Sequence, residues 1–191
     1  MANRTQIVCL HEGLQGRSID PVFFNALIRV LRPGWIRQHK GSNLARFVPC
    51  GGRTELIQRM PRELRACIQS GAETTLVVCA DVDHDTPDCD ALREKFRREA
   101  LSAGTSDSDF DRVVFVFAKD RLENWIEFLL TGATDESREG PRVPHNRKVA
   151  DAAKVLAGRC LNQSGGAELP DSLQWSCRNW RRLVETMHDN A

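Results

Sequence analysis

The sequence predicts an α/β fold of three layers, in which a mostly parallel central sheet lies between helices. The first observation is that strand-like and helix-like segments alternate from residue 6 to about residue 130. The second is that Thr74–Ala80 (TTLVVCA) and Arg112–Ala118 (RVVFVFA) are almost continuously apolar, as strands of a parallel sheet buried on both faces are. The third is that 191 residues, 41% of them hydrophobic, suit one compact domain.

The first predicted strand is Gln6–Leu10 (QIVCL), a short apolar run rich in residues that favour strands. A helix follows, because Asp20 is a suitable N-cap and Pro21 suits the first helical position. Apolar residues then recur at helical spacing as far as Leu31, and Pro33-Gly34 ends the helix.

Residues 35–38 and 45–49 are expected to form two weak strands. Gly51-Gly52 then turns the chain into a helix over Thr54–Ser70. In this helix Pro61 predicts either a kink or a late start. The helix is indicated by apolar residues at a spacing of four, namely Leu56, Met60, Leu64 and Ile68.

The second half of the chain continues the alternation after the strand at Thr74–Ala80. We expect residues 1–135 to form the core of the domain, and residues 136–191 to add a loop and C-terminal helices that pack on it. The predicted elements are a helix over Asp88–Ala103, a polar loop over Gly104–Asp111, a strand over Arg112–Ala118, a helix over Leu122–Leu130, a loop over Glu136–Pro144, and helices over Arg147–Cys160 and Ser172–His188.

Composition predicts a soluble, cytoplasmic protein without a membrane segment. The N-terminal residues show no signal-peptide pattern, and no apolar run approaches the ~18 residues that a membrane helix needs. The seven cysteines are an odd number and include no CxxC pair, so they favour reduced thiols over a disulfide framework. Cys9 and Cys79 lie within apolar strands and are expected to be small buried residues.

The formal net charge of +1 conceals an uneven distribution. Residues 1–65 carry 11 Lys and Arg against 4 Asp and Glu, whereas residues 66–139 carry 8 against 17. An acidic middle beside a basic segment suits a cation site that acts on a polyanion. Ordinary solvated helix faces explain the same pattern, and composition does not separate the two interpretations.

Acidic residues follow three of the predicted strands. Glu12 comes after the first strand, Asp81 and Asp83 come directly after Thr74–Ala80, and Glu123 comes shortly after Arg112–Ala118. Because ligand sites of parallel sheets lie beyond the carboxyl ends of the strands, these side chains are expected to meet. Clustered carboxylates repel one another, and a hard divalent cation such as Mg²⁺ removes that repulsion. The sequence therefore indicates a metal site at this edge.

The combination of these segments resembles the Toprim domain, the metal-binding α/β fold of topoisomerases, primases and overcoming-lysogenization-defect nucleases. More narrowly, the chain is similar to the small stand-alone Toprim-like proteins of bacterial anti-phage defence loci. The segments that carry the resemblance are Ile7–Gly13 (IVCLHEG), Cys50–Leu56 (CGGRTEL), Leu76–Asp83 (LVVCADVD) and Val114–Ile126 (VFVFAKDRLENWI).

The resemblance implies a nuclease that uses Mg²⁺ or Mn²⁺ to cleave DNA or RNA, as the effector of a defence system. In that family pattern Glu12 is a metal ligand or a general acid/base, and Asp81 and Asp83 are metal ligands. Glu123 is a further acidic ligand or a positioning group. Asp85 lies beyond the usual pair and is either another ligand or a helix cap, and His11 stands where an apolar or small residue is commoner. Implied partners are nucleic acid and a protein such as an ATPase, with a homo-oligomer left open.

Basic residues near the acidic ones are candidates for phosphate binding. Arg53 stands at a predicted helix start, where free backbone N–H groups favour an anion, and Lys119, Arg121 and Lys148 flank the predicted site. The basic first third of the chain is expected to guide a nucleic-acid backbone towards the acidic centre. The residues of that segment singled out are Arg29, Arg32, Arg37, Lys40 and Arg46.

Two other functions stay open at this point. The chain could be a Toprim-shaped binding or regulatory subunit with little activity of its own. It could also be a phosphatase or phosphotransferase that uses Asp81 of the Asp-x-Asp pair on a small phosphate ester.

Overall fold

The centre of the protein is a four-stranded sheet in which every strand is parallel to its neighbours. The computed structural model describes residues 6–14, 16, 18–31, 45–70, 74–141, 146–162 and 168–189. The strand order is β2-β1-β3-β4, so β2 and β4 are the edge strands. The predicted α/β fold with a parallel sheet is confirmed. The strands are β1 (Gln6–His11), β2 (Ala45–Pro49), β3 (Thr74–Val82) and β4 (Val114–Lys119).

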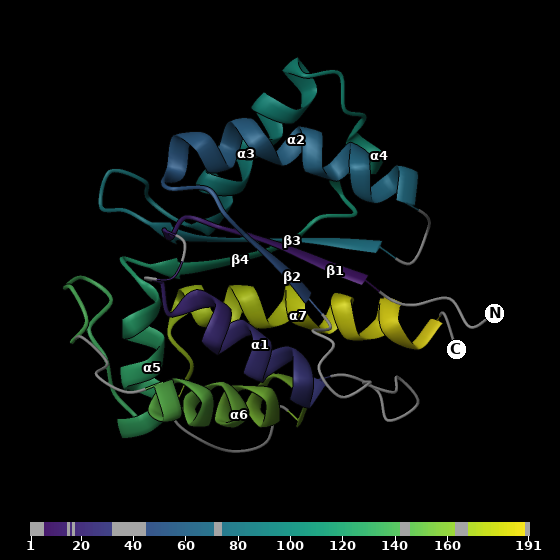
Figure 1. Ribbon diagram of the computed structural model, residues 1–191. Helices are drawn as coiled ribbons and strands as arrows, with labels where there is room; N and C mark the ends of the chain where they lie inside the picture. The colour runs from purple at the N-terminus through teal and green to yellow at the C-terminus, as the bar shows by residue number, and fades with distance from the viewer. Residues whose placement is uncertain are drawn as a thin grey trace.

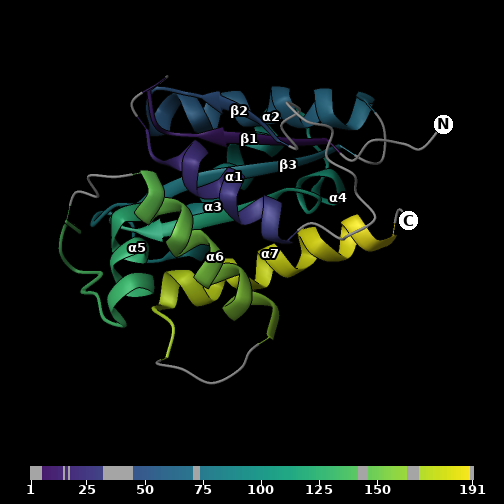
Figure 2. The same ribbon diagram turned by 60° about the horizontal axis from the view of Figure 1, so that its bottom comes forward.

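Helices cover both faces of this sheet, which gives the three layers that the sequence predicts (Figure 1). One face is covered by α2, α3 and α4, and the other by α1, α5, α6 and α7, with α6 lying outside α1 (Figure 2). The helices are α1 (Asp20–Leu31), α2 (Arg53–Ser70), α3 (Cys89–Ser102), α4 (Asp107–Phe110), α5 (Leu122–Thr131), α6 (Asn146–Asn162) and α7 (Asp171–Asp189).

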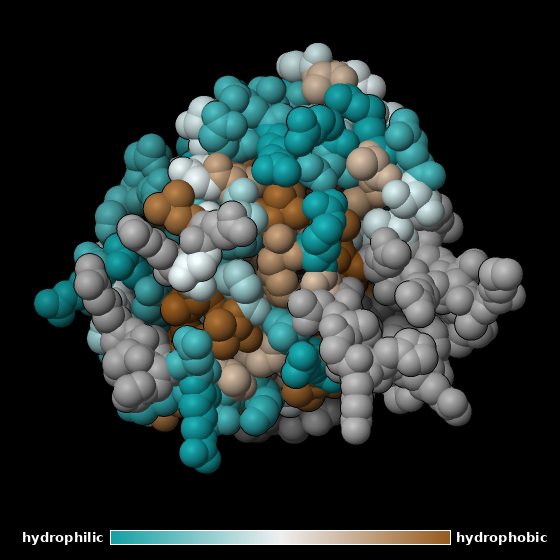
Figure 3. Space-filling model, viewed as in Figure 1, coloured by the Kyte–Doolittle hydropathy of each residue, from teal (hydrophilic) through white to brown (hydrophobic). Residues whose placement is uncertain are grey.

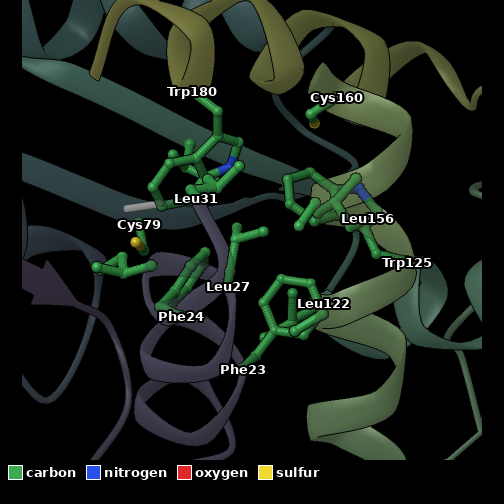
Figure 4. Packing of buried hydrophobic residues seen from close by; sticks show 14 of the residues in the cluster. Phe23, Phe24, Leu27, Leu31, Cys79, Leu122, Trp125, Leu156, Cys160 and Trp180 are labelled. Carbon is green, nitrogen blue, oxygen red and sulfur yellow. The ribbon is translucent and has the colours of Figure 1, made fainter. Parts of the chain in front are cut away.

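The alternation of side chains along the strands divides the core in two. In β1, Ile7 and Cys9 pack towards α1, whereas Val8 and Leu10 pack towards α2. Since both faces are covered, every one of these residues is buried, and this explains why the strands lack a polar face. The cluster around α1 also contains the largest buried side chains, Trp125 and Trp180 among them (Figure 4).

Two predicted segments differ in detail from the structure, and a third lies outside the described residues. Helix α2 begins at Arg53 and continues through Pro61, so the late start does not occur. The predicted loop 104–111 contains the short helix α4, which Ser106 caps by accepting the Asp109 N–H. The predicted strand at residues 35–38 lies outside the described residues.

Helix α7 closes the exposed edge of the sheet. Its Ser176 hydroxyl accepts a hydrogen bond from the N–H of Phe117 at 3.0 Å and donates one to the carbonyl of Phe117 at 3.1 Å. The Asn179 amide donates to the carbonyl of Phe115 at 2.8 Å. These groups of β4 would otherwise be unpaired, because among the described residues no strand pairs with the outer side of β4. Polar side chains of α7 therefore bond to main-chain groups of β4 that a neighbouring strand would otherwise pair.

We expect Ser176→Ala to destabilise the protein by about 1–3 kcal/mol, since it leaves the buried N–H of Phe117 unpaired. Urea unfolding should show a lower midpoint with an unchanged slope. Gln174→Ala, at an exposed position of the same helix, is the control and should leave the midpoint in place. Equal midpoints for Ser176→Ala and the wild type would show that the edge bond contributes nothing.

The prediction that the cysteines are reduced is wrong for one pair. Cys160 at the end of α6 and Cys177 in α7 form a disulfide, with their Cα atoms 5.2 Å apart. The pair lies 17 residues apart in the sequence, and the packing of α6 against α7 brings it together. The sequence spacing alone does not show that packing. The other five cysteines are free, and Cys9 and Cys79 are buried as predicted.

Over the described residues, no helix has both the length and the apolar composition needed to cross a membrane.

Candidate functional site

The carboxyl ends of β1 and β3 lie side by side and carry the acidic residues. His11, the last residue of β1, is in register with Cys79 of β3, so Glu12 directly after β1 lies next to the last residues of β3, where Asp81 stands. Helices α1, α2 and α5 each follow a strand, and their N-termini therefore lie at the same edge. The sequence predicts this meeting point, and the structure brings Glu12, Asp81 and Asp83 together around Arg53.

The carboxylate of Glu12 is paired with Arg53, the first residue of α2. Its Oε1 accepts hydrogen bonds from Nε of Arg53 at 2.5 Å and from the N–H of Asp81 at 3.1 Å. The Glu12 and Arg53 side chains are 20% and 18% exposed, so water screens the pair only partly. Burial raises the pKa of Glu12, and the Arg53 guanidinium opposes that rise.

Arg53 also reaches the Asp-x-Asp segment. Its Nη2 donates to the main-chain carbonyl of Asp81 and lies 3.2 Å from Oδ2 of Asp83. Asp83 itself is 57% exposed. The sequence predicts Arg53 as a phosphate ligand at a helix start, and in this structure the guanidinium instead joins the turn after β1 to the end of β3.

The carboxyl group of Asp81 lies in the most acidic surroundings of the site. Burial holds the pKa of Asp81 well above its usual range, and the negative charges of Asp20, Glu12 and Glu123 raise it further. Arg53 opposes the rise, but one positive charge faces several carboxylates. Asp81 belongs to the face of β3 that packs under α1 and α5, and this position explains why residues from those two helices surround it.

Asp20 is a site residue that the sequence identifies only as a helix cap. It stands in the first turn of α1, and its carboxylate accepts a hydrogen bond from the Ser18 hydroxyl. Its charge raises the pKa of both Asp81 and Glu123. Burial is the largest cause of the raised pKa of Glu123. No motif marks Asp20, because its place depends on how α1 returns to the sheet edge.

His11 lies directly beneath this group and is 2% exposed. Burial lowers its pKa, and the charge of Asp20 opposes that change. Its Nδ1 has no hydrogen-bond partner among the described residues. Burial therefore favours the neutral form of this imidazole beside the carboxylates.

The end of β4 borders the site and carries two of the predicted phosphate ligands. Lys119 donates to the carbonyl of Thr86 at 2.9 Å, and Arg121 pairs with Glu139. Between them Asp120 has a φ of 61°, which is rare for a residue other than glycine. Its N–H donates to the carbonyl of Val82, so the strained residue fastens the end of β4 to the end of β3.

The remaining predicted residues lie away from the carboxylates. Asp85 is exposed and accepts a hydrogen bond from the Thr86 hydroxyl. Lys148 is exposed in the first turns of α6. Of the predicted basic residues in the first third of the chain, Arg32, Arg37 and Lys40 lie outside the described residues.

The donor chemistry of the site can be compared with the predicted cation. Carboxylate oxygens are the ligands that Mg²⁺ and Mn²⁺ prefer, and Asp20, Glu12 and Glu123 place negative charge around Asp81, which Arg53 opposes. Within the part of the chain that is described, however, no three Asp, Glu, His or Cys side chains are placed as a metal-binding group. The residues therefore fit a hard cation by their chemistry, while Arg53 supplies the positive charge between Glu12 and Asp83.

Comparison of the chain with protein-family models, with curated proteins and with solved structures finds no match in any of the three.

The raised pKa values predict how stability depends on pH. A carboxyl group whose pKa is raised by folding stabilises the protein below its unfolded pKa, and this contribution is lost as pH rises through the folded value. His11 acts in the opposite direction, because its pKa is lowered. In EDTA, we expect the Tm of Asp81→Asn minus that of the wild type to grow from about pH 4 upwards. Thermal scans at a series of pH values measure it, and a difference independent of pH would contradict the raised pKa of Asp81.

Proposed function

We propose that the protein is a metal-dependent phosphodiester hydrolase that cleaves DNA or RNA. The observation that carries the proposal is the group of carboxylates around Asp81, in which Asp20, Glu12 and Glu123 all raise its pKa. Such a group is unfavourable for the folded protein alone. In a site that binds a cation together with a phosphate, the cation relieves the repulsion between the carboxylates.

In this proposal Asp81 and Asp83 hold the cation, and Glu12 completes its surroundings or carries a proton. When bound, Mg²⁺ or Mn²⁺ would neutralise the carboxylates and stabilise negative charge on the phosphate oxygens. Glu12 suits proton transfer because burial raises its pKa towards neutrality. Arg53 would turn from Glu12 and Asp83 to the substrate, since a guanidinium binds phosphate oxygens through paired N–H groups.

The raised pKa of Asp81 also sets a condition on its role. The raised pKa favours the protonated form of Asp81, and because a protonated carboxylic acid is a poor metal ligand, a cation competes with the proton for this group. Metal binding is therefore expected to strengthen as pH rises. Neutral His11 below the site adds no positive charge that would oppose a cation.

A second candidate is a binding subunit with little activity of its own. The observation that favours it is the pairing of Arg53 with Glu12 and Asp83, which satisfies those carboxylates without a cation. A subunit of this kind would bind its partner equally well in EDTA. The role as a defence effector and the ATPase partner are implied by the family resemblance alone.

The experiment that separates the candidates is a cleavage assay with purified protein. Plasmid, single-stranded DNA and total tRNA are incubated in Mg²⁺, Mn²⁺ or EDTA, beside a chromogenic phosphomonoester. The proposal expects cleavage of a nucleic acid that requires metal and is lost in Asp81→Asn/Asp83→Asn. Hydrolysis of the phosphomonoester alone would indicate a phosphatase. No cleavage of any substrate by the wild type would contradict the proposal and favour the binding subunit.

A further inference from the structure

Three arginines surround one buried carboxylate on the outer flank of α2. Glu63 has only 9% of its side chain exposed, and it accepts hydrogen bonds from Arg59 at 3.1 Å, Arg46 at 3.2 Å and Arg62 at 3.5 Å. Arg59 and Arg62 belong to α2, whereas Arg46 comes from the edge strand β2. These three arginines and Glu63 are called the arginine cluster below.

The arginine cluster has a net positive charge, because three guanidinium groups surround the single carboxylate of Glu63. Burial acts to raise the pKa of Glu63, but the hydrogen bonds from Arg59 and Arg46 outweigh it and hold the pKa below its usual value. Glu63 is therefore ionised, and three guanidinium groups face one negative charge. Arg46 and Arg62 are 60% and 71% exposed, and each uses one nitrogen on Glu63. Since a guanidinium has five N–H donors, most of their donors remain available to a ligand.

The arginine cluster lies along the same helix that begins in the carboxylate site. Arg53 is the first residue of α2, and Arg59 and Arg62 follow six and nine positions later, which is ~9 Å and ~14 Å along the helix axis. The surface around α2 is hydrophilic in the space-filling view (Figure 3). Arg53, Arg59 and Arg62 thus follow one another along a single helix that begins at the carboxylate site.

The chemistry of this surface fits a strand of phosphates. Guanidinium groups bind phosphate oxygens in forked pairs, and a row of them matches a ligand with regularly repeated charge. One strand of a duplex advances ~3.4 Å along the duplex axis per phosphate, so the distance from Arg53 to Arg62 along α2 equals the axial advance of roughly four phosphates. The cluster includes no aromatic residue, so it would contact the backbone without reading the bases.

We infer that the arginine cluster binds the phosphodiester backbone of a nucleic-acid strand and leads it to the carboxylates at the start of α2. This inference rests on the proposed nuclease function and adds the surface by which the substrate is held. It differs from a general attraction to basic residues, because it assigns the contact to Arg46 and Arg62, which a single buried anchor orients. Glu55 is exposed on α2, one helical turn before Arg59, and its charge opposes the ligand.

The test is a binding measurement that is separate from cleavage. Fluorescence anisotropy with a labelled single-stranded oligonucleotide, and with a duplex of the same sequence, is recorded in EDTA at several KCl concentrations. The variant is Arg46→Gln/Arg62→Gln, in which Arg59 still pairs with Glu63. The matched control, Arg98→Gln/Arg138→Gln, removes the same charge from exposed positions on α3 and in the loop after α5.

We expect the cluster variant to bind roughly tenfold more weakly and the slope of log K against log[KCl] to fall by about 1–2. The control should bind as the wild type does, and Glu55→Gln should bind more tightly. The inference is overturned if the cluster variant binds as tightly as the wild type, if the control loses as much affinity, or if the wild type does not bind. It is also overturned if polyglutamate binds as tightly as the oligonucleotide, because the ligand would then be an acidic protein.

Binding and cleavage can fail separately. Asp81→Asn/Asp83→Asn should bind the oligonucleotide in EDTA no less tightly than the wild type, although it should not cleave. Binding that depends on the cluster, without cleavage by the wild type, would contradict the proposed nuclease and leave the binding surface in place. Cleavage without dependence on the cluster would contradict the surface alone.

Discussion

Asp81→Asn is expected to abolish cleavage and at the same time to stabilise the metal-free protein. The substitution removes a proposed metal ligand, and losses of roughly a thousandfold or more follow when such a group is removed. It also replaces a carboxyl group, whose pKa burial and three other carboxylates raise, with a neutral amide of the same shape. In EDTA at pH 7 the Tm should rise by several degrees, since ~1 kcal/mol shifts the Tm by about 2–4 °C for a chain of this size.

The two opposite effects are what distinguish a functional carboxylate from a structural one. Asp151→Asn, at a half-exposed position of α6, is the control and should change neither cleavage nor Tm. Adding Mg²⁺ should raise the Tm of the wild type and leave that of Asp81→Asn unchanged. A lower Tm for Asp81→Asn in EDTA would show that the carboxylate stabilises the fold, and the interpretation of the site would be wrong.

Arg53→Gln is expected to have the second-largest effect, in the opposite direction. Loss of the guanidinium leaves Glu12 and Asp83 without their ion pair and removes a hydrogen bond to the carbonyl of Asp81. Because the Glu12 side chain is 20% exposed, the loss of stability in EDTA should be about 1–3 kcal/mol rather than that of a fully buried pair. Mg²⁺ should restore much of it by supplying the missing positive charge. Urea unfolding with and without Mg²⁺ measures both effects.

Two further variants make the test of Arg53 specific. Arg53→Lys keeps the charge but loses the forked geometry, so it should lie between the wild type and Arg53→Gln. Arg97→Gln removes an exposed ion pair with Asp107 and should change stability little, with no effect of Mg²⁺. If Mg²⁺ stabilises Arg53→Gln no more than it stabilises Arg97→Gln, the guanidinium does not stand in for a cation.

The helices and strands that the sequence predicts best are those with an unbroken set of buried apolar residues. Thr74–Ala80 is apolar after its two threonines, and such a run suits a strand covered on both faces. The four-residue spacing of Leu56, Met60 and Leu64 identifies the buried stripe of α2 in the same way. The short helix α4 was missed because its boundaries depend on the Ser106 cap rather than on an apolar period.

Contacts between distant elements could not be predicted. Ser176 and Asn179 read as ordinary polar residues of an amphipathic helix, yet they bond to β4 because α7 docks at the edge of the sheet. The Cys160–Cys177 disulfide likewise depends on the packing of α6 against α7. Both contacts depend on tertiary packing and cannot be inferred from the local sequence pattern.

The location of the site could be predicted from the sequence, but the ion pairs and charge interactions within it could not. The rule that ligands lie beyond the carboxyl ends of parallel strands selects Glu12, Asp81 and Asp83 from the sequence. The same rule does not indicate that Arg53 turns to Glu12, or that the cap residue Asp20 contributes a charge to Asp81. Those relations depend on where α1 and α2 begin in space.

The most direct test of the central claim is a calorimetric titration of Mn²⁺ into the metal-free protein and into Asp81→Asn. We expect the wild type to bind Mn²⁺ with release of protons, because the raised pKa of Asp81 favours its protonated form and the metal competes with that proton. Asp81→Asn should show no comparable binding. If the wild type binds no Mn²⁺, or if Asp81→Asn binds it equally well, the carboxylates around Asp81 are not a cation site and the account is contradicted.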